Sequence, residues 1–335
     1  MEKHLFIGAM LCSLLFACKE APLEDPTLGK TSKSTPTIKQ YYQFTPFAGD
    51  GKPGNCDGRP NVARFDNPGG LAAYSDGSLL VADMFNYKIR KVSPTGVVST
   101  FAGGKKGRID GPLAQAQFEF PAGVAIAPNG TIYVLELGYV RKIKDGIVST
   151  IPLNQSFGSG SVIAVSPSGK IYISHFDKSQ ILRISEDGEI VVVAGSDPGF
   201  KDGIGNSAKF KNPRGLAIDL DETIYVADSQ NRRIRKISPS GVVTTLAGDG
   251  DFNNRDGQGT DASFIRPETL TIAKDGNLYL CGSNGDLKRI TKSGLVTTLE
   301  TTTFPWFSTN YITSVNNTLF VVDNSSPKIF KLDLY

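Results

Sequence analysis

Few side chains in this sequence could carry out catalysis or hold a transition metal. The 335 residues include only two histidines, His4 and His175. A zinc site built on imidazole needs two or three histidines close together. His4 lies in an N-terminal segment expected to be removed, so His175 is left as the only histidine of the mature chain. No serine or cysteine nucleophile with a neighbouring base is evident either, and the sequence predicts no catalytic residues and no metal site.

Arg214 and Glu268 are the strongest candidates for polar chemistry near the centre of the molecule. Each stands just before an apolar run that we expect to form an innermost strand. Together with His175 they would supply a channel-centred hydrolase or lyase, the alternative function for this chain. A calcium cage needs several oxygen ligands and more than one carboxylate, and Glu268 is the only acid at these strand starts. No cofactor is therefore predicted, with Ca²⁺ kept as an option.

The segment 249–254 begins like a calcium-binding loop, with aspartates in its first and third positions. Its sixth residue is Asn254 where such loops need glycine, and its twelfth is Thr260 where they need glutamate. The sequence therefore argues against calcium at this loop.

Aromatic and amide side chains are the candidates for ligand binding. They fall in the connections expected between the second and third strands of successive repeats. These residues are Phe85, Tyr87, Tyr139, Phe176 and Asn231, with His175 beside Phe176. Phe304 and Phe307 form a further aromatic pair around Trp306. A rim that mixes aromatic and polar groups suits a glycan or a peptide.

The elements that must position these residues come from an internal repeat. A phrase recurs four times: Asp-Gly, then Ala-x-Phe-x-x-Pro, then an apolar run. The Asp-Gly pairs are Asp57-Gly58, Asp110-Gly111, Asp202-Gly203 and Asp256-Gly257. A fixed period of roughly 40 to 55 residues is typical of solenoids, propellers and arrays.

Each repeat contains four short apolar runs separated by turn residues. In the first repeat the runs are 70–74, 78–83, 87–92 and 97–103. Four such runs predict a four-stranded antiparallel meander, and no stretch between them has a sustained helical period. The ends of the second strands align at Asp83, Glu136, His175, Asp228, Gly282 and Asp323, which gives six repeats.

The two ends of the chain complete one repeat between them. The last repeat has only three runs, and the segment 41–49 matches the fourth runs 97–103 and 242–248. Sharing a sheet between the ends leaves no open edge. The sequence therefore predicts an all-β fold: a six-bladed β-propeller of four-stranded antiparallel blades over residues 38–335, with the N-terminal strand completing the last blade.

The repeated charges have structural interpretations in this architecture. Equivalent acids on neighbouring blades should lie roughly 10 Å apart, since two strand spacings separate them from the axis. Such acids cannot converge on one ion, and they are expected to satisfy the backbone of nearby turns. Basic residues recur on the third strands, as in 88–91 and 232–236, interleaved with acids. We expect these strands to be solvated and predict no nucleic-acid partner.

The segment 226–247 carries the resemblance to a known family. Its residues Val-Ala-Asp-Ser-Gln-Asn-Arg-Arg-Ile-Arg-Lys-Ile, followed by Ser-Pro-Ser-Gly-Val-Val-Thr-Thr-Leu-Ala, resemble the NHL repeat. The form is similar to that of secreted bacterial lipoproteins. The resemblance implies a propeller fold; members include binding domains, sensor domains and a lyase, so it says little about chemistry.

The first residues predict a cellular address. Lys3 precedes the apolar run 5–16, which is too short to span a bilayer and suits a signal peptide. Ala17 before Cys18 resembles a bacterial lipoprotein cleavage site. We therefore expect a signal peptide over 1–17, lipidation of Cys18, and a flexible tether over 18–37 that is rich in Pro, Ser, Thr and Lys. The expected location is the bacterial cell envelope, lipid-anchored at the outer membrane on its periplasmic or surface face.

The remaining cysteines and the overall charge add little chemistry. Cys56 and Cys281 could pair in an oxidising compartment, but two unpaired thiols with Cys281 buried is the favoured interpretation. The formal charge is only +3, so bulk electrostatics indicate no polyanionic partner. The sequence as a whole predicts a monomeric, non-enzymatic binding or scaffold lipoprotein, with one propeller face taking a glycan, peptide or protein of the envelope. Its only contact with the membrane would be the lipid anchor.

Overall fold

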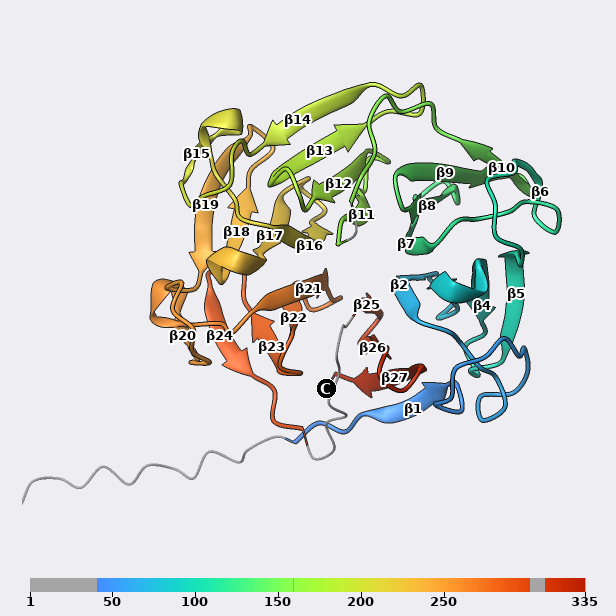
Figure 1. The fold of residues 1–335 in the computed structure, drawn as a ribbon. Helices are drawn as coiled ribbons and strands as arrows, with labels where there is room; N and C mark the ends of the chain where they lie inside the picture. The colour runs from blue at the N-terminus through green and yellow to red at the C-terminus, as the bar shows by residue number, and fades with distance from the viewer. Residues whose placement is uncertain (1–40, 159, 302–310, 335) are drawn as a thin grey trace, which may run out of the picture. The chain divides into compact units, whose positions relative to one another are not determined.

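Six antiparallel β-sheets stand around a common centre in the computed structural model, which describes residues 41–158, 160–301 and 311–334 (Figure 1). These sheets are the blades of a propeller, numbered 1 to 6 from the first complete one. The compact unit they form spans Gln40–Tyr335. The six-bladed β-propeller predicted from the repeats is confirmed.

The first three blades follow one another along the chain. Blade 1 contains β2 (Pro68–Ala73), β3 (Leu79–Asp83), β4 (Lys88–Val92) and β5 (Val98–Gly103). Blade 2 contains β7 (Pro121–Ile126), β8 (Ile132–Glu136), β9 (Tyr139–Lys144) and β10 (Ile147–Thr150). Blade 3 contains β11 (Val162–Val165), β12 (Ile171–His175), β13 (Gln180–Ile184) and β14 (Ile190–Ala194).

The other three blades complete the ring. Blade 4 contains β16 (Pro213–Ile218), β17 (Ile224–Asp228), β18 (Arg233–Ile237) and β19 (Val242–Ala247). Blade 5 contains β21 (Pro267–Ile272), β22 (Leu278–Gly282), β23 (Leu287–Ile290) and β24 (Leu295–Thr298). Blade 6 contains β25 (Ile312–Val315), β26 (Thr318–Asp323), β27 (Lys328–Asp333) and β1 (Thr45–Ala48).

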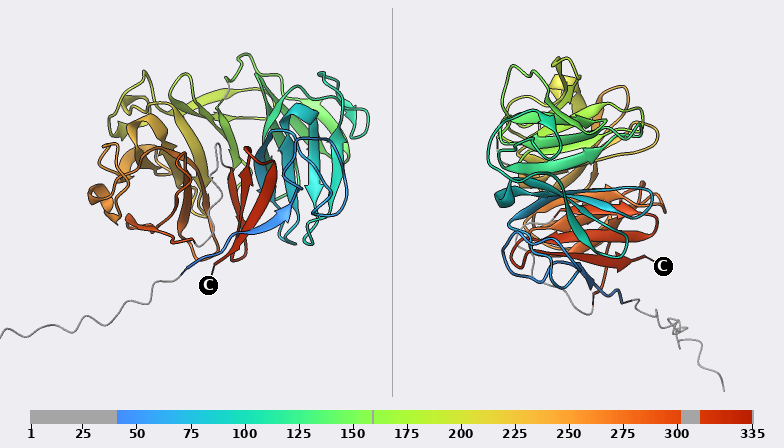
Figure 2. Two further views of the ribbon diagram at one scale, coloured as in Figure 1. Left: turned by 60° about the horizontal axis from the view of Figure 1, so that its bottom comes forward. Right: turned by 90° about the vertical axis from the view of Figure 1, so that its right-hand side faces the viewer.

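The ring is closed by the strand from the other end of the chain, as the sequence predicts. β1 pairs antiparallel with β27, with Thr45 opposite Lys331 and Pro46 opposite Phe330. Phe47 on β1 also packs against Phe320 on β26, with ring centroids 4.9 Å apart. The view in Figure 2 shows β1 lying alongside the red strands of blade 6. Closure of this kind removes the free sheet edge.

Three blades carry a fifth, two-residue strand that the sequence does not predict. These strands are β6 (Gly111–Pro112), β15 (Gly203–Ile204) and β20 (Gly257–Gln258), which pair with β10, β19 and β24. Each is the glycine of an Asp-Gly pair and the residue after it. The repeated phrase thus runs along the outer edge of its own blade before turning inward to the first strand.

The short 3₁₀ helices occupy the connections. η1 (Met84–Asn86) and η3 (Ser229–Asn231) follow the second strands of blades 1 and 4. η2 (Gly205–Ser207) and η4 (Gly259–Asp261) follow the Asp-Gly strands of blades 4 and 5. Phe85 N–H donates to the carbonyl of Asp66, and Gln230 N–H to that of Lys211. These bonds place the second-to-third-strand connections beside the phrases that precede the inner strands, on one face of the ring, which we call the phrase face.

The core lies between blades rather than in one central cluster. Six groups of buried apolar residues each draw on two adjacent blades. The phenylalanine of each phrase fills such a layer, and Phe65, Phe118 and Phe210 are completely buried. The second strands are buried along their whole length in blades 1 to 5. Their continuous apolar runs follow from this, because neighbouring blades cover both of their faces.

Candidate functional site

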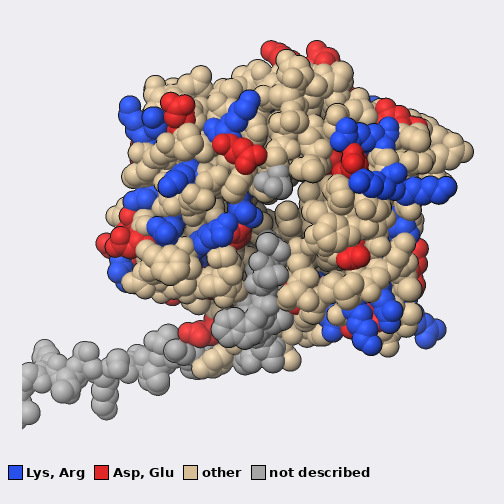
Figure 3. Space-filling model, in the orientation of Figure 1, with Lys and Arg blue, Asp and Glu red and all other residues tan. Residues whose placement is uncertain are grey.

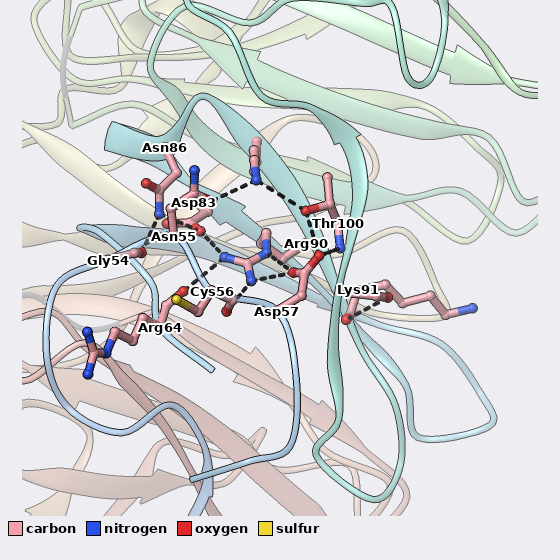
Figure 4. Close-up of polar contacts among 12 residues, drawn as sticks. Gly54, Asn55, Cys56, Asp57, Arg64, Asp83, Asn86, Arg90, Lys91 and Thr100 are labelled. Atoms are coloured by element: carbon pink, nitrogen blue, oxygen red, sulfur yellow. Dashed lines mark hydrogen bonds and ion pairs between the residues drawn. The ribbon is translucent and has the colours of Figure 1, made fainter. Parts of the chain in front are cut away.

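Arg90 on β4 is completely buried although it carries a permanent charge (Figure 4). Its guanidinium donates to Asp83 Oδ2 at 2.6 Å and to Asp57 Oδ1 at 2.5 Å. It also donates to the carbonyl oxygens of Arg64 and Cys56, at 3.0 and 2.8 Å. The charge is thus paired and fully hydrogen-bonded, which is the condition under which an interior tolerates it.

The aspartate of the Asp-Gly pair extends this network to the outermost strand. Asp57 Oδ2 accepts hydrogen bonds from Thr100 N–H at 2.9 Å and from Thr100 Oγ1 at 3.0 Å. Asp83, at the end of β3, accepts the N–H of Asp66 at 2.8 Å. One arginine and two carboxylates therefore link the phrase to the second, third and fourth strands of the blade.

The same network recurs in blades 2 and 4, and blade 5 keeps the part that joins a buried third-strand cation to the aspartate of the Asp-Gly pair. Arg141, Arg235 and Lys288 take the place of Arg90 in blades 2, 4 and 5. Their ion pairs are Arg141 with Asp110 at 2.6 Å and Glu136 at 3.1 Å, Arg235 with Asp202 at 2.6 Å and Asp228 at 2.8 Å, and Lys288 with Asp256 at 2.9 Å. The prediction that the basic third strands are solvated is wrong for these four side chains, each at most 1% exposed. The repeated acids have a structural role, as predicted, but their main partner is a buried cation.

In blades 1 and 2, the two carboxylates of the network have different electrostatic environments. Burial raises the pKa of Asp83, and it raises the pKa of Glu136 to about 7. Partial burial would also raise the pKa of Asp57 and Asp110, but the adjacent guanidinium and threonine hydrogen bonds outweigh it and hold both below the usual value. The aspartate of the Asp-Gly pair is therefore the more firmly ionised partner.

Blade 3 replaces this network with uncharged groups. His175 stands at the position of Asp83, and Leu182 at that of Arg90. The His175 imidazole is 2% exposed and packs edge-on against Phe157, with ring centroids 5.6 Å apart. Its Nδ1 is buried without a hydrogen-bond partner, and burial lowers the pKa of the imidazole. His175 is therefore a core residue, not a member of the polar set with Arg214 and Glu268.

The six innermost strands, β2, β7, β11, β16, β21 and β25, stand around the centre of the ring in Figure 1, and their residues line a central channel. It has a volume of about 270 Å³, and its walls are mainly small or aliphatic, with hydroxyl groups from Thr269, Thr271, Tyr311 and Thr313. Adjacent inner strands approach backbone to backbone: a Cβ on Gly215 would lie 2.7 Å from Thr269 Cα. The glycines at the strand starts make this close approach possible.

Arg214 and Glu268 meet at the mouth of this channel. Both follow the proline of their phrase, so they occupy the same position on adjacent blades. Arg214 Nη1 lies 2.8 Å from Glu268 Oε2, and Arg266 Nε lies 2.8 Å from Oε1. The Arg214 guanidinium also lies 4.9 Å from the centroid of the Phe176 ring. Three of the predicted binding residues, from three successive blades, are thus brought together.

The channel-mouth cluster of Arg214, Arg266, Glu268 and Phe176 carries an excess of positive charge. Burial raises the pKa of Glu268, against the two arginines that favour its ionised form. Burial also raises the pKa of Tyr311, whose hydroxyl group interacts electrostatically with both Arg214 and Glu268. Arg214 Nε is buried without a hydrogen-bond partner. Two guanidinium groups beside one carboxylate leave donors that an anionic or carbonyl-bearing ligand could use.

The equivalent positions on the first three blades are small. Gly69, Ala122 and Gly160 stand where Arg214 and Glu268 stand in blades 4 and 5. The charged side chains at the mouth therefore come from one side of the ring. Position by position, the comparison of these blades assigns the charged side of the channel mouth to blades 4 and 5.

Aromatic side chains gather on the same face over blades 1 and 2. Phe85 is 49% exposed, and its ring centroid lies 6.1 Å from that of Phe120 in edge-to-face geometry. The Tyr87 and Phe120 rings lie 5.4 Å apart, also edge to face. Tyr139, 36% exposed, stacks with Arg108 at 4.0 Å and accepts a 2.7 Å hydrogen bond from Arg108 Nη1. Sequence reasoning found Phe85, Tyr87 and Tyr139 but missed Phe120.

Phe120 and Tyr87 both have a left-handed backbone conformation, with φ of 53° and 55°. A bulky residue at positive φ is uncommon and costs roughly 1–2 kcal/mol. The phrases of blades 1 and 4 have Asn67 and Asn212 at the position of Phe120, also at positive φ. Asparagine tolerates this region. The signal that could have revealed Phe120 was therefore an aromatic residue at a position where two other repeats have asparagine.

The remaining predicted residues lie elsewhere. Asn231 donates from its amide to the carbonyl of Gly199 at 2.7 Å and to Asp228 Oδ2 at 2.8 Å, so it is engaged in holding η3. Cys18, Phe304 and Phe307 lie outside the described residues. Cys56 and Cys281 are both free thiols, the first exposed and the second buried.

No group of three or more His, Cys, Asp or Glu side chains able to hold a metal occurs in the described ranges. In the loop that begins like a calcium site, Asp249 Oδ1 accepts the N–H of Asp251, and Oδ2 pairs with Arg255 at 2.8 Å. The leading carboxylate is therefore engaged with the protein.

Charges of both signs are interspersed around the face seen in Figure 3. Several exposed charges of the molecule are paired with a charge of opposite sign, as Arg108 is with Glu119 and Lys142 with Glu186. Within the described part of the chain, no helix has the length and apolar character needed to cross a bilayer.

Comparison with known proteins identifies similar sequences over parts of the chain. The family model for the teneurin NHL domain matches residues 148–238. Protein SUPPRESSOR OF QUENCHING 1, chloroplastic, of Arabidopsis thaliana is 28% identical over 281 residues, which cover 71% of this chain and 26% of that protein. Teneurin-3 of Mus musculus is 31% identical over 226 residues, covering 54% of this chain and 8% of the teneurin. The chain thus spans only a minor part of the relatives it matches.

Solved structures show the same architecture. A structural genomics protein of unknown function from Bacteroides thetaiotaomicron superposes with a TM-score of 0.66 at 17% identity, covering 87% of this chain and 76% of that one. At this level of identity the likeness establishes the fold alone.

Proposed function

We propose that this chain is a non-enzymatic binding or scaffold protein of the NHL-repeat β-propeller type, and that its phrase face takes a glycan, peptide or protein partner. The observation that carries the proposal is the convergence of Arg214, Glu268 and Phe176 at the channel mouth. These side chains come from three blades. Blades 1 to 3 have glycine or alanine at the position of Arg214 and Glu268, so the repeat itself does not require a charged side chain there. Concave sites with few polar groups on a rigid frame are typical of ligand recognition.

The geometry supports binding better than catalysis. The hydrolase or lyase alternative would join His175 to Arg214 and Glu268, but the imidazole packs on Phe157 inside blade 3. Glu268 is held between two guanidinium groups, each at 2.8 Å. A carboxylate held in this way is suited to orienting its arginines toward a ligand rather than to transferring protons.

The proposed location is the cell envelope, with the lipid on Cys18 as the only membrane contact and a monomeric propeller beyond the tether. The apolar run 5–16 and the Ala17-Cys18 pair support this. In a bacterial host, the N-terminal peptide of the mature protein should carry a diacylglyceryl group on Cys18, as read by mass spectrometry. A Cys18→Ala protein should leave the membrane fraction. Wild-type protein recovered with an unmodified Cys18 would refute the anchor.

The binding proposal is tested by a thermal-shift screen of the full chain in mild detergent against oligosaccharides and short peptides, followed by titration of any ligand found. A ligand at a hundred times its dissociation constant should stabilise the fold by about 2.7 kcal/mol. The double variant Arg214→Gln/Glu268→Gln removes the charges at the mouth with little change of volume. It should weaken a mouth ligand at least tenfold.

The matched control is the double variant Lys170→Gln/Glu222→Gln. This pair also joins adjacent blades, at 3.5 Å, but from the turns between first and second strands on the opposite face. It should leave binding unchanged. A ligand whose affinity falls equally in both double variants would contradict the assignment to the phrase face, and so would turnover of a bound ligand by the wild type.

A further inference from the structure

The strongest unassigned feature is an aromatic residue in a strained place. Phe120 occupies a left-handed backbone position, φ 53°, where two other repeats place asparagine. In blade 4 that asparagine has a structural role, because Asn212 Nδ2 donates to the carbonyl of Phe176 in the preceding blade, at 3.2 Å. The fold therefore has a less strained solution for this position, a residue that tolerates positive φ, and blade 2 does not use it. Strain retained against an available alternative points to function.

The Phe120 ring belongs to a partly exposed aromatic cluster. Phe120 contacts Tyr87 at 5.4 Å and Phe85 at 6.1 Å, both on the neighbouring blade. Phe85 is 49% exposed. Tyr87 also has positive φ, where blade 4 has Arg232 and blade 3 has Ser179. Because the packing of these aromatic rings against one another fixes their positions, the side chains would lose little conformational freedom when a ligand binds to them.

One cation beside these rings is only loosely paired. Lys106 Nζ lies 4.9 Å from the Phe120 ring centroid, and its side chain is 52% exposed. Its nearest carboxylate, Glu119, lies 3.6 Å away, beyond hydrogen-bond distance. That same carboxylate is bound at 2.6 Å by Arg108. The Lys106 ammonium is therefore free to pair with a ligand anion.

Resting on the proposed binding function, we propose that Phe85, Tyr87, Phe120 and Lys106, here called the blade 1–2 platform, bind a glycan that contains uronic acid residues. A pyranose ring offers a face of C–H groups that stacks on an aromatic ring, and its carboxylate would meet the Lys106 ammonium. An extended peptide would also seek backbone partners. The N–H groups of Phe85 and Tyr87 already donate to Asp66 and Met84 carbonyls.

The test is isothermal titration of the full chain with hexasaccharides of galacturonate, mannuronate and hyaluronan, beside neutral cellohexaose and a hexaglutamate peptide. At least one uronate hexasaccharide should bind, at least tenfold more tightly than cellohexaose or hexaglutamate. Phe120→Asn and Lys106→Met should each weaken that binding tenfold or more. Because asparagine is the residue of the other repeats, Phe120→Asn should melt no lower than the wild type, which excludes misfolding as the cause.

Two controls separate this inference from the proposed function. Lys105→Met changes an exposed neighbouring lysine and should bind uronate normally, as should Arg214→Gln/Glu268→Gln at the channel mouth. Three results would each overturn the platform: no binding of any uronate, uronate binding unchanged in Phe120→Asn, or hexaglutamate binding that depends on the same two residues. In these cases a ligand held at the channel mouth would still support the proposed function.

Discussion

Arg235 and Arg255 both pair with aspartate at 2.8 Å, yet the two pairs differ in what surrounds them. Arg235 and Asp228 have completely buried side chains, whereas the Arg255 side chain is 53% exposed. An exposed pair gains little, because water screens the attraction and the side chains lose freedom. A buried pair that loses one member leaves the other charge without a partner in a medium that solvates it poorly.

Arg235→Met should therefore destabilise the protein by about 3–5 kcal/mol, since it strands Asp228 in the interior. Arg255→Met should change the free energy of unfolding by no more than about 1 kcal/mol. Urea unfolding followed by fluorescence measures both. Equal losses in the two variants would mean that the buried network is not what stabilises the blade.

His175 should make the protein less stable in mild acid. Burial holds the pKa of its imidazole below the ordinary value of 6.5, so the unfolded chain takes up a proton first as the pH falls. The stabilising contribution is complete above pH 6.5 and is lost as the pH falls through the folded-state pKa. His175→Leu should reduce the difference in unfolding free energy between pH 7.5 and pH 5. The same difference in both proteins would show that other groups cause the effect.

Sequence reasoning reached some residues and missed others for a physical reason. Arg214 and Glu268 were found because strand starts on adjacent blades must meet around a channel. The buried arginines were missed because alternating basic and apolar residues are also the pattern of a strand with one solvated face. The available signal was joint occurrence: the four blades whose phrase begins with an Asp-Gly pair have a cation at the position of Arg90, whereas blade 3 lacks that pair and has Leu182 there.

At the scale of the element, the blades are unequal in how they are held. Blades 1, 2, 4 and 5 each link a phrase to their outer strands through a buried cation. In the described part of blade 3 the sheet has four strands and the corresponding interior is apolar. Local stability should follow this difference, because proteins open in cooperative units whose stabilities vary.

Hydrogen exchange followed by mass spectrometry should reveal this difference in local stability between blade 3 and the other blades. Amides of β13 and β14 in blade 3 should exchange about tenfold or more faster than those of β18 and β19 in blade 4. A tenfold ratio of exchange rates corresponds to a difference of about 1.4 kcal/mol in the free energy of local opening. This difference is smaller than the loss of stability expected when a buried ion pair is broken by Arg235→Met. Slower exchange in blade 3 than in blade 4 would contradict the stabilising role of the buried cations.

The elements themselves were the most predictable part of the molecule. Because the sequence repeats, each strand of the blade occurs several times along the chain. The turn residues and apolar runs of one repeat could therefore be compared with those of the others. The two-residue strands β6, β15 and β20 were not predicted, because Gly111-Pro112 or Gly257-Gln258 has no strand character of its own. They form because Asp110 and Asp256 are fixed to the threonines of the outer strand.

At the scale of the whole molecule, Cys281 reports on global unfolding. Its thiol is completely buried between blades 5 and 6, and burial raises its pKa, so the reactive thiolate is rare and inaccessible. Cys56 is exposed. Maleimide labelling with peptide mass spectrometry should modify Cys56 in minutes under native conditions, and Cys281 only at the rate of unfolding, rising with urea. Equal labelling rates would mean that the layer between blades 5 and 6 opens locally.

The pairing of β1 with β27 decides how this protein would respond to mechanical load. A pull on the chain before Tyr41 first loads the hydrogen bond from Tyr42 N–H to the Glu300 carbonyl and then β1, the first strand of the propeller. The hydrogen bonds to β27 and the contact of Phe47 with Phe320 must then carry the force. Rupture there would open the ring and leave β27 with an unsatisfied edge. Under tension, the strand that closes the propeller would be the first strand to bear the load.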